Sequence, residues 1–287
     1  MSYIRHSPIN QSSLIYILLS TILFGFLDAL WKPLIDELGH LNTLIHRTLL
    51  TTTGIGIYFL FTEIWVGDWL MILWTIGSGI IAFFGLFFLT KAFQTAGTIS
   101  IVFLNVCTIL VGQLSSRLLF DESIQLPLYT TQLVGSVFVV LLLNNFRFKI
   151  QKGLWYGLGA SLCFGIAYPL MGIPIPVLGN LQATLIQEFT VLLCIAGMVF
   201  MQGGIRLEPQ VFVNTKLLLL VFCTCVSLIL YFYSYTVYPI YKVNLISHFY
   251  PVAALLTAYI WFKEKPSLFQ WFGVFLSIGL LFSLGFN

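Results

Sequence analysis

The chain has 287 residues, of which 59% are hydrophobic and only 8% are charged, and its formal net charge at pH 7 is +3. This composition, with a mean hydropathy of +0.98, excludes a soluble globular domain of this length. The small positive charge is spread over the predicted loops, so the sequence indicates no nucleic-acid surface.

Ten apolar runs follow one another along the chain with short breaks between them. A helix needs roughly 20 residues to cross the hydrocarbon core of a bilayer. The runs cover residues 14–32, 41–62, 69–92, 98–119, 127–143, 153–171, 181–202, 216–237, 243–262 and 267–286. Segments such as 83–89 and 217–222 are apolar throughout, whereas strands of a membrane β-barrel alternate polar and apolar residues. We therefore predict an all-α integral membrane protein with ten transmembrane helices.

A short N-terminal tail, residues 1–13, precedes the first predicted helix, and almost nothing follows the last one. We therefore expect no attached soluble domain and place the function within the membrane. The first run is long for the apolar region of a signal peptide, so we expect a retained helix. The five cysteines lie in apolar runs and are expected to be buried thiols, not metal ligands or disulfides. They are Cys107, Cys163, Cys194, Cys223 and Cys225.

The second half of the chain repeats features of the first half in the same order. Two similar segments, 118–123 and 260–265, each end an apolar run, and their glutamates Glu122 and Glu264 are 142 residues apart. Further pairs at similar offsets are Phe24-Gly25 with Phe164-Gly165, Ile45-His46-Arg47 with Ile186-Gln187-Glu188, and 89–94 with 233–238. These matches predict a first five-helix repeat over 14–146 and a second over 147–287. Because five is odd, the second repeat would be inverted in the membrane, an arrangement found in secondary transporters.

The chain resembles the EamA-type drug/metabolite transporters, which have ten helices in two inverted five-helix repeats. The residues that carry this resemblance are Phe24-Gly25, Arg47, Ala92, Glu122, Phe164-Gly165, Pro251, Gly273 and Gly279. The sequence departs from the pattern at Ile109, which stands where a proline would match, and at Glu188, which replaces an arginine. The resemblance implies a site between the repeats and cytoplasmic termini. The distribution of Lys and Arg over the predicted loops favours the opposite orientation, with both termini outside.

Asp28 and Lys32 are charged residues at membrane depth in the first predicted helix. A charge near the bilayer centre costs roughly 2.5–3.5 kcal/mol on insertion scales, so it usually faces a cavity or a partner. The two residues are four apart and therefore share one helix face. They form either a structural ion pair near the helix end or a vestibule in which Asp28 binds a substrate amine or a proton.

Glu188 lies in an apolar part of the seventh predicted helix and needs a partner from another helix. Its repeat counterpart is Arg47, which follows His46 just as Glu188 follows Gln187. Inverted repeats would bring Arg47 and Glu188 toward one pseudo-twofold axis. A structural ion pair and a proton-coupling site are both open interpretations of these two residues.

Other polar residues and prolines complete the set of candidates. His248 either bonds the backbone carbonyl that Pro251 leaves free or contacts the ligand. Lys91, at the end of the third helix, either extends to the interface or attracts an anion in the cavity. Pro169 and Pro251 are candidate helix bends. The remaining candidates for the substrate or proton pathway are His46, Asn105, Gln187, Tyr233, Tyr235 and Asn244.

These features predict a secondary transporter of small metabolites or xenobiotics, an exporter in a bacterial inner membrane, that works by alternating access. The sequence has no Walker-type loop for ATP, so an ion gradient or exchange would drive transport, with Asp28 and Glu188 as candidate proton carriers. The expected partners are membrane lipids, a small molecule and protons, with no cofactor or metal. The alternatives are a non-transporting membrane subunit and, less favoured for lack of a catalytic motif, a membrane-embedded enzyme.

Overall fold

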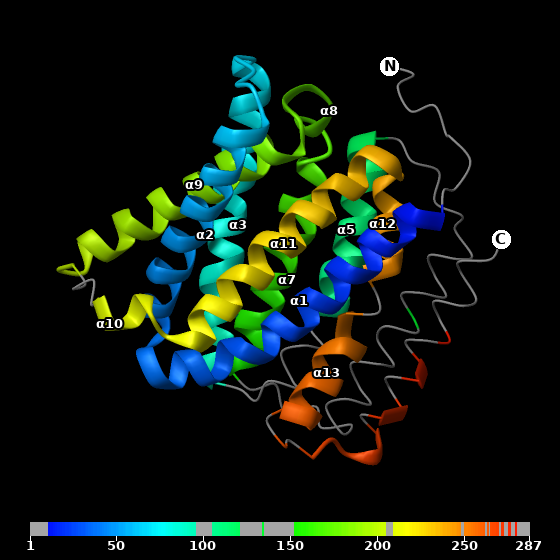
Figure 1. Cartoon of the computed structure of the whole chain (residues 1–287). Helices are drawn as coiled ribbons and strands as arrows, with labels where there is room; N and C mark the ends of the chain where they lie inside the picture. The colour runs from blue at the N-terminus through cyan, green and yellow to red at the C-terminus, as the bar shows by residue number, and fades with distance from the viewer. Residues whose placement is uncertain are drawn as a thin grey trace.

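The computed structural model describes residues 11–95, 105–120, 152–204, 209–247 and 250–261, together with positions 134, 263, 265–269, 271–272, 275–276 and 279. Over these residues all regular structure is helical (Figure 1). The long helices are α1 (Gln11–Leu38), α2 (His40–Thr62), α3 (Trp69–Thr95), α5 (Asn105–Phe120), α7 (Lys152–Leu170), α9 (Asn180–Met201) and α11 (Thr215–Val237). The shorter ones are α8 (Ile175–Leu178), α10 (Pro209–Phe212), α12 (Ile240–Ile246) and α13 (Tyr250–Trp261).

Five of the described helices are long and apolar enough to cross a membrane. The spans are Leu14–Leu38, His40–Thr62, Trp69–Thr95, Asn180–Met201 and Thr215–Val237, and two shorter apolar helices are Cys107–Phe120 and Val252–Trp261. Large apolar side chains such as Ile15, Phe61 and Phe222 are exposed on these helices, as contact with lipid requires. The predicted all-helical, multi-pass membrane class is confirmed. The number of ten helices and the inverted arrangement stay predictions.

Two predicted helix boundaries are wrong. The first helix was expected to end at residue 32, before Pro33, yet α1 continues to Leu38 with Pro33 inside it. A proline within a membrane helix is tolerated where neighbouring helices restore the freed backbone contacts. The predicted helix 243–262 is divided into α12 and α13, and Pro251 lies in the first turn of α13, where its missing N–H costs no helical hydrogen bond.

Other predicted elements lie wholly or partly outside the described residues. Residue 134 is the single described position of the predicted helix 127–143, and most of 267–286 is not described. Glu122 and Glu264, which first suggested the repeat, also lie outside the described residues.

Helices at corresponding positions of the two predicted repeats contact corresponding helices of the other half. Helix α1 packs against α11 and α13, while its predicted repeat counterpart α7 packs against α3 and α5 (Figure 1). Helices α2 and α9, which are counterparts of each other, also pack together. This pattern of neighbours is the one that a duplicated five-helix unit would produce.

Gly25 and Gly165 explain one of the sequence matches in physical terms. A Cβ atom on Gly25 would lie 2.6 Å from Ala253 Cβ of α13, and one on Gly165 would lie 2.6 Å from Val111 Cβ of α5. Glycine at such positions allows two membrane helices to approach closely. The matching Phe-Gly pairs therefore occupy two equivalent helix crossings.

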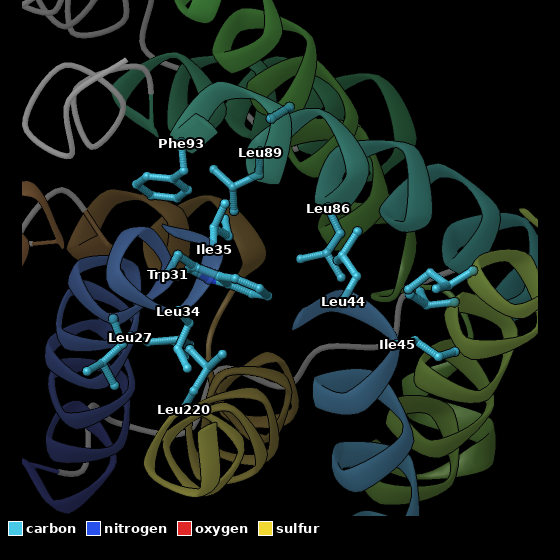
Figure 2. Packing of buried hydrophobic residues seen from close by; sticks show 14 of the residues in the cluster. Leu27, Trp31, Leu34, Ile35, Leu44, Ile45, Leu86, Leu89, Phe93 and Leu220 are labelled. Carbon is cyan, nitrogen blue, oxygen red and sulfur yellow. The ribbon is translucent and has the colours of Figure 1, made fainter. Parts of the chain in front are cut away.

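Among the described residues, a large buried apolar cluster joins α1, α2, α3, α7, α9, α10 and α11. Figure 2 shows Leu27, Trp31 and Leu34 of α1 near Leu220 of α11, with Trp31 extending toward Leu44 and Leu86. Burying such side chains between helices fixes the positions of these helices. Polar side chains that project from the same helices are thereby held around a common interior space.

Candidate functional site

A cavity of about 130 Å³ lies among the helices of both halves. Aromatic side chains, including Phe24, Trp31, Phe164, Tyr168 and Tyr231, form much of its lining. The charged and amide residues that line it are Asp28, Arg47, Gln187, Glu188 and Asn244. The cavity therefore combines apolar walls with a few charged groups, as small-molecule sites usually do.

Arg47 of α2 and Glu188 of α9 form a buried ion pair in the wall of this cavity. Arg47 Nη1 donates a hydrogen bond to Glu188 Oε2 at 2.8 Å, and the two residues are only 5% and 6% exposed. A buried charge is tolerated when an opposite charge and good geometry compensate for lost hydration. The structure thus brings together the two residues that the repeat alignment paired.

Asp28 lines the cavity and is 5% exposed, whereas Lys32 does not line it. Lys32 forms an ion pair with Asp36, one helical turn further along α1, at 3.3 Å, and its Nζ also donates to the Phe93 carbonyl oxygen at 3.4 Å. The interpretation of Asp28 and Lys32 as an ion pair is therefore wrong. Lys32 turns toward the exposed end of α1, where its ammonium is better hydrated.

Two hydrogen-bonded chains hold the amide side chains in place. Gln187 Nε2 donates to Ser78 Oγ at 2.8 Å, and Ser78 in turn donates to the Ala167 carbonyl oxygen, which connects α9, α3 and α7. The hydroxyl of Tyr231 donates to Asn244 Oδ1 at 2.8 Å, and Asn244 Nδ2 donates to Ser116 Oγ, which connects α11, α12 and α5. Both amides are thus fixed by contacts between helices.

Several predicted site residues do not line the cavity. His46 is fully buried, its Nδ1 donates to the Asn42 carbonyl oxygen, and its ring packs against Phe212. Tyr233 is exposed and packs against Tyr16, and Lys91 also lies away from the cavity. Tyr235 is buried and donates to the hydroxyl of Tyr231, so it supports the lining from behind.

Pro169 does line the cavity, near the end of α7. His248 and the side chains of Asn105 and Pro251 lie outside what the structure describes.

Comparison with known proteins gives a family for the second half of the chain. Residues 151–285 match the model of the EamA-like transporter family. The match covers slightly less than half of the chain. The predicted resemblance is thereby confirmed over the matched residues, and together with the apolar helices it supports a multi-pass membrane protein of a transporter family.

The whole chain also resembles solved structures. Of 28 matching chains, one described as "Crystal structure of protein" has a TM-score of 0.68, covers 96% of this chain and 96% of its own, and shares 16% sequence identity. At that identity the likeness shows the fold alone. No curated protein matches the chain.

Sequence reasoning missed the hydroxyl groups and aromatic side chains of the lining. Phe164 and Tyr168 are four residues apart on one face of α7, and both line the cavity together with Gly165. Trp31 likewise follows Phe24 and Asp28 on one face of α1. The spacing of four and three residues was a usable signal. Thr21, Thr108, Ser247 and Tyr250 gave no comparable pattern.

The lining groups can bind a small molecule by several kinds of contact. Two carboxylates and one guanidinium offer sites for charged groups, the amides and hydroxyls offer hydrogen bonds, and the rings offer apolar contact. Among the described residues there is no group of three or more His, Cys, Asp or Glu side chains that could hold a metal ion. The described lining of the cavity is therefore suited to binding and charge compensation.

Proposed function

We propose that the chain is a secondary transporter that exports small metabolites or xenobiotics and binds them in the cavity between its two halves. The observation that carries this proposal is the buried Arg47–Glu188 ion pair, to which each half contributes one charge at the cavity wall. Because the pair crosses from α2 to α9, relative movement of the halves would separate or reorient the two charges. Alternating access of two inverted repeats would provide such a movement.

Proton coupling is the finer part of the proposal. Glu188 would carry the proton, because protonation removes its charge and weakens its attraction to Arg47, which allows the two halves to part. Asp28 of α1 lines the same cavity and would bind an amine group of the substrate or a second proton. A cavity with both signs of charge suits zwitterionic substrates.

The test is uptake into proteoliposomes with an imposed pH gradient. The solutes would include amino acids, nucleosides and cationic dyes, and wild type would be compared with Glu188→Gln, which keeps the side-chain shape but cannot ionise. We expect gradient-driven flux in wild type and its loss in the variant, with Glu63→Gln on the exposed end of α2 as the matched control. Flux that is equal in wild type and Glu188→Gln would remove Glu188 from the mechanism.

Absence of flux for every solute would instead favour a non-transporting membrane subunit. Transport is preferred to catalysis because the matched family consists of transporters. The proposed location is the inner membrane of a bacterium.

A further inference from the structure

Three threonines of α2 have buried hydroxyl groups that make no hydrogen bond within the structure. They are Thr48, Thr51 and Thr52, with exposed fractions of 0%, 0% and 7%. The Nε atom of Arg47, on the same helix, is also buried without a partner. We call these four groups the threonine junction.

Other buried threonines in the described helices behave differently. Each donates its hydroxyl hydrogen to the backbone carbonyl oxygen four residues earlier, at 2.6–3.1 Å, as is usual for threonine inside a helix. These are Thr21, Thr43, Thr75, Thr90, Thr184, Thr190 and Thr224. The hydroxyls of the threonine junction are turned away from this local acceptor, so they are available to a molecule between the helices.

The threonine junction lies on the face of α2 that packs against α9 and α11. At about 100° per residue, Arg47 and the three threonines fall within an arc of about 140° on α2. Ile55 and Phe59 continue the same face and pack with Leu181 of α9, beside Cys225 and Ile229 of α11. The thiol of Cys225 also donates to the Thr51 carbonyl oxygen at 3.8 Å.

Arg47 belongs to the threonine junction and, with its partner Glu188, also to the wall of the cavity. Arg47 and Glu188 both line the cavity, whereas none of the three threonines does. On the other side, the apolar cluster of Ile55, Phe59 and Leu181 closes the junction toward the C-terminal end of α2. Glu188 is thus paired with a residue that belongs to both the threonine junction and the cavity wall.

The chemistry of the threonine junction suits water better than a metal cation. Each hydroxyl can both donate and accept a hydrogen bond, and Arg47 Nε can only donate. A metal cation binds acceptors only and would leave Arg47 Nε without a partner, whereas water matches both kinds of group and commonly satisfies buried polar atoms. We propose that the threonine junction holds a short chain of water molecules that gives Glu188 a proton path separate from the substrate cavity.

The proton step balances as a simple exchange and rests on the proposed role of Glu188 as proton carrier. The O–H bond of the protonated carboxyl breaks and a new O–H bond forms on the first water molecule, which passes one of its own protons to the next water. The carboxylate left behind pairs with Arg47. The other titratable or charged groups near Glu188 are Asp28 of α1, Tyr168 of α7, Tyr231 and Cys225 of α11, and Tyr250 of α13. Departure of the proton requires the apolar cluster to part, so the path does not leak.

Water access is measured first, because it does not depend on transport. All five native cysteines that the structure describes are free thiols and would be replaced by serine or alanine. The variant Thr51→Cys would then be treated with Ag⁺, and Thr75→Cys would serve as the control. After denaturation, the thiols that had not reacted with Ag⁺ would be quantified with a maleimide. Thr75 is equally buried but donates to its own helix.

We expect Ag⁺ to block Cys at position 51 at least ten times faster than Cys at position 75. Equal rates would overturn the water-filled junction, whether or not the protein transports anything. This readout separates failure of the inference from failure of the proposed function.

Proton coupling is measured second, with Thr→Val changes that keep the side-chain shape. In the triple variant of Thr48, Thr51 and Thr52, the rate of pH-driven transport should fall at least tenfold. The rate of substrate exchange without a gradient should stay within twofold of wild type. Thr75→Val with Thr90→Val is the control, since both hydroxyls bond their own helix. Unchanged pH-driven transport in the triple variant would overturn the proton path.

Discussion

Helices α2 and α9 occupy matching places in the two halves of the chain and share a common beginning. Gly39 and Gly179 precede them with nearly identical backbone angles, φ 78° and ψ 155° against φ 81° and ψ 156°. One turn later Thr43 and Thr184 each donate to the carbonyl oxygen four residues back. The same local structure is therefore built twice.

The two helices then diverge. Arg47 of α2 faces Glu188 of α9, and the residues that follow are Thr48, Thr51 and Thr52 in α2 but Phe189, Leu192 and Leu193 in α9. The threonines are buried, whereas Phe189 and Leu193 are 49% and 56% exposed. The two helices thus share the backbone turn before their first residue, whereas the residues after the ion pair are buried threonines in α2 and apolar side chains in α9.

The largest effect is expected from separating the charges of Arg47 and Glu188. Arg47→Leu leaves the carboxylate of Glu188 buried without its partner, which costs about 3–5 kcal/mol of unfolding free energy for pairs of this kind. The double change of both residues to Leu removes the unpaired charge, so stability should largely return while transport stays lost. Thermal unfolding in detergent and proteoliposome flux measure the two properties.

If Arg47→Leu alone were as stable as wild type, the carboxylate would have to be protonated or paired elsewhere. Arg117→Leu on the exposed face of α5 is the matched control and should change stability little.

A second effect should appear at the helix crossings of Gly25 and Gly165. Alanine at either position would meet atoms at 2.6 Å, so we expect each change to cost toward the upper end of about 1–3 kcal/mol, as overpacking does. Gly197→Ala is the control, since a Cβ there has nothing within 4 Å and alanine favours the helix. A large difference between Gly25→Ala and Gly165→Ala would show that the two crossings are not equivalent.

A third, smaller effect concerns the glycines that begin α2 and α9. Their backbone angles lie in a region that residues with a Cβ rarely adopt, so Gly39→Ala and Gly179→Ala should each cost about 1 kcal/mol. Nothing crowds a Cβ at Gly39, and the cost there comes from the backbone alone. Equal shifts in the unfolding temperature would support the local equivalence, and Gly67→Ala, in a loop without positive φ, should be neutral.

The site residues that the sequence predicted are those that carry a charge at membrane depth or match a residue of the other predicted repeat. Arg47 and Glu188 occupy matching positions in the two predicted repeats, which suggested that they pair. The chain has few other charged residues in its apolar runs with which either one could pair. Asp28 and Lys32 were paired by helical spacing, but spacing ignores that an ammonium near a helix end can turn toward water and Asp36. Hydropathy alone predicted the five described helices that are long and apolar enough to cross a membrane.

The threonine junction could not be read from the sequence in this way. Threonine is common in membrane helices, and its hydroxyl usually bonds its own backbone, as Thr75 and Thr90 do. Whether the Thr51 hydroxyl bonds its own backbone depends on its rotamer and on the helices that it faces. Both are set by packing between helices that are distant in the sequence.

The smallest effect is expected at an exposed ion pair that also joins the two halves. Lys216 Nζ of α11 lies 2.8 Å from Glu37 Oε2 of α1, but the side chains are 53% and 43% exposed, so water and salt screen the attraction. A double-mutant cycle with Lys216→Met and Glu37→Gln should give a coupling of about 0.2–1 kcal/mol, falling as salt is added.

Asn214 provides a contrast at the same place. Its side-chain oxygen accepts hydrogen bonds from the backbone N–H groups of Lys216 and Leu217 and so caps α11, and its amide donates to Glu37. Asn214→Ala should therefore cost about 1 kcal/mol, more than loss of the neighbouring charge. If the Glu37–Lys216 coupling instead equalled that of Arg47 and Glu188, burial would not be what distinguishes the two ion pairs, and the special role given to the buried pair would lose its physical basis.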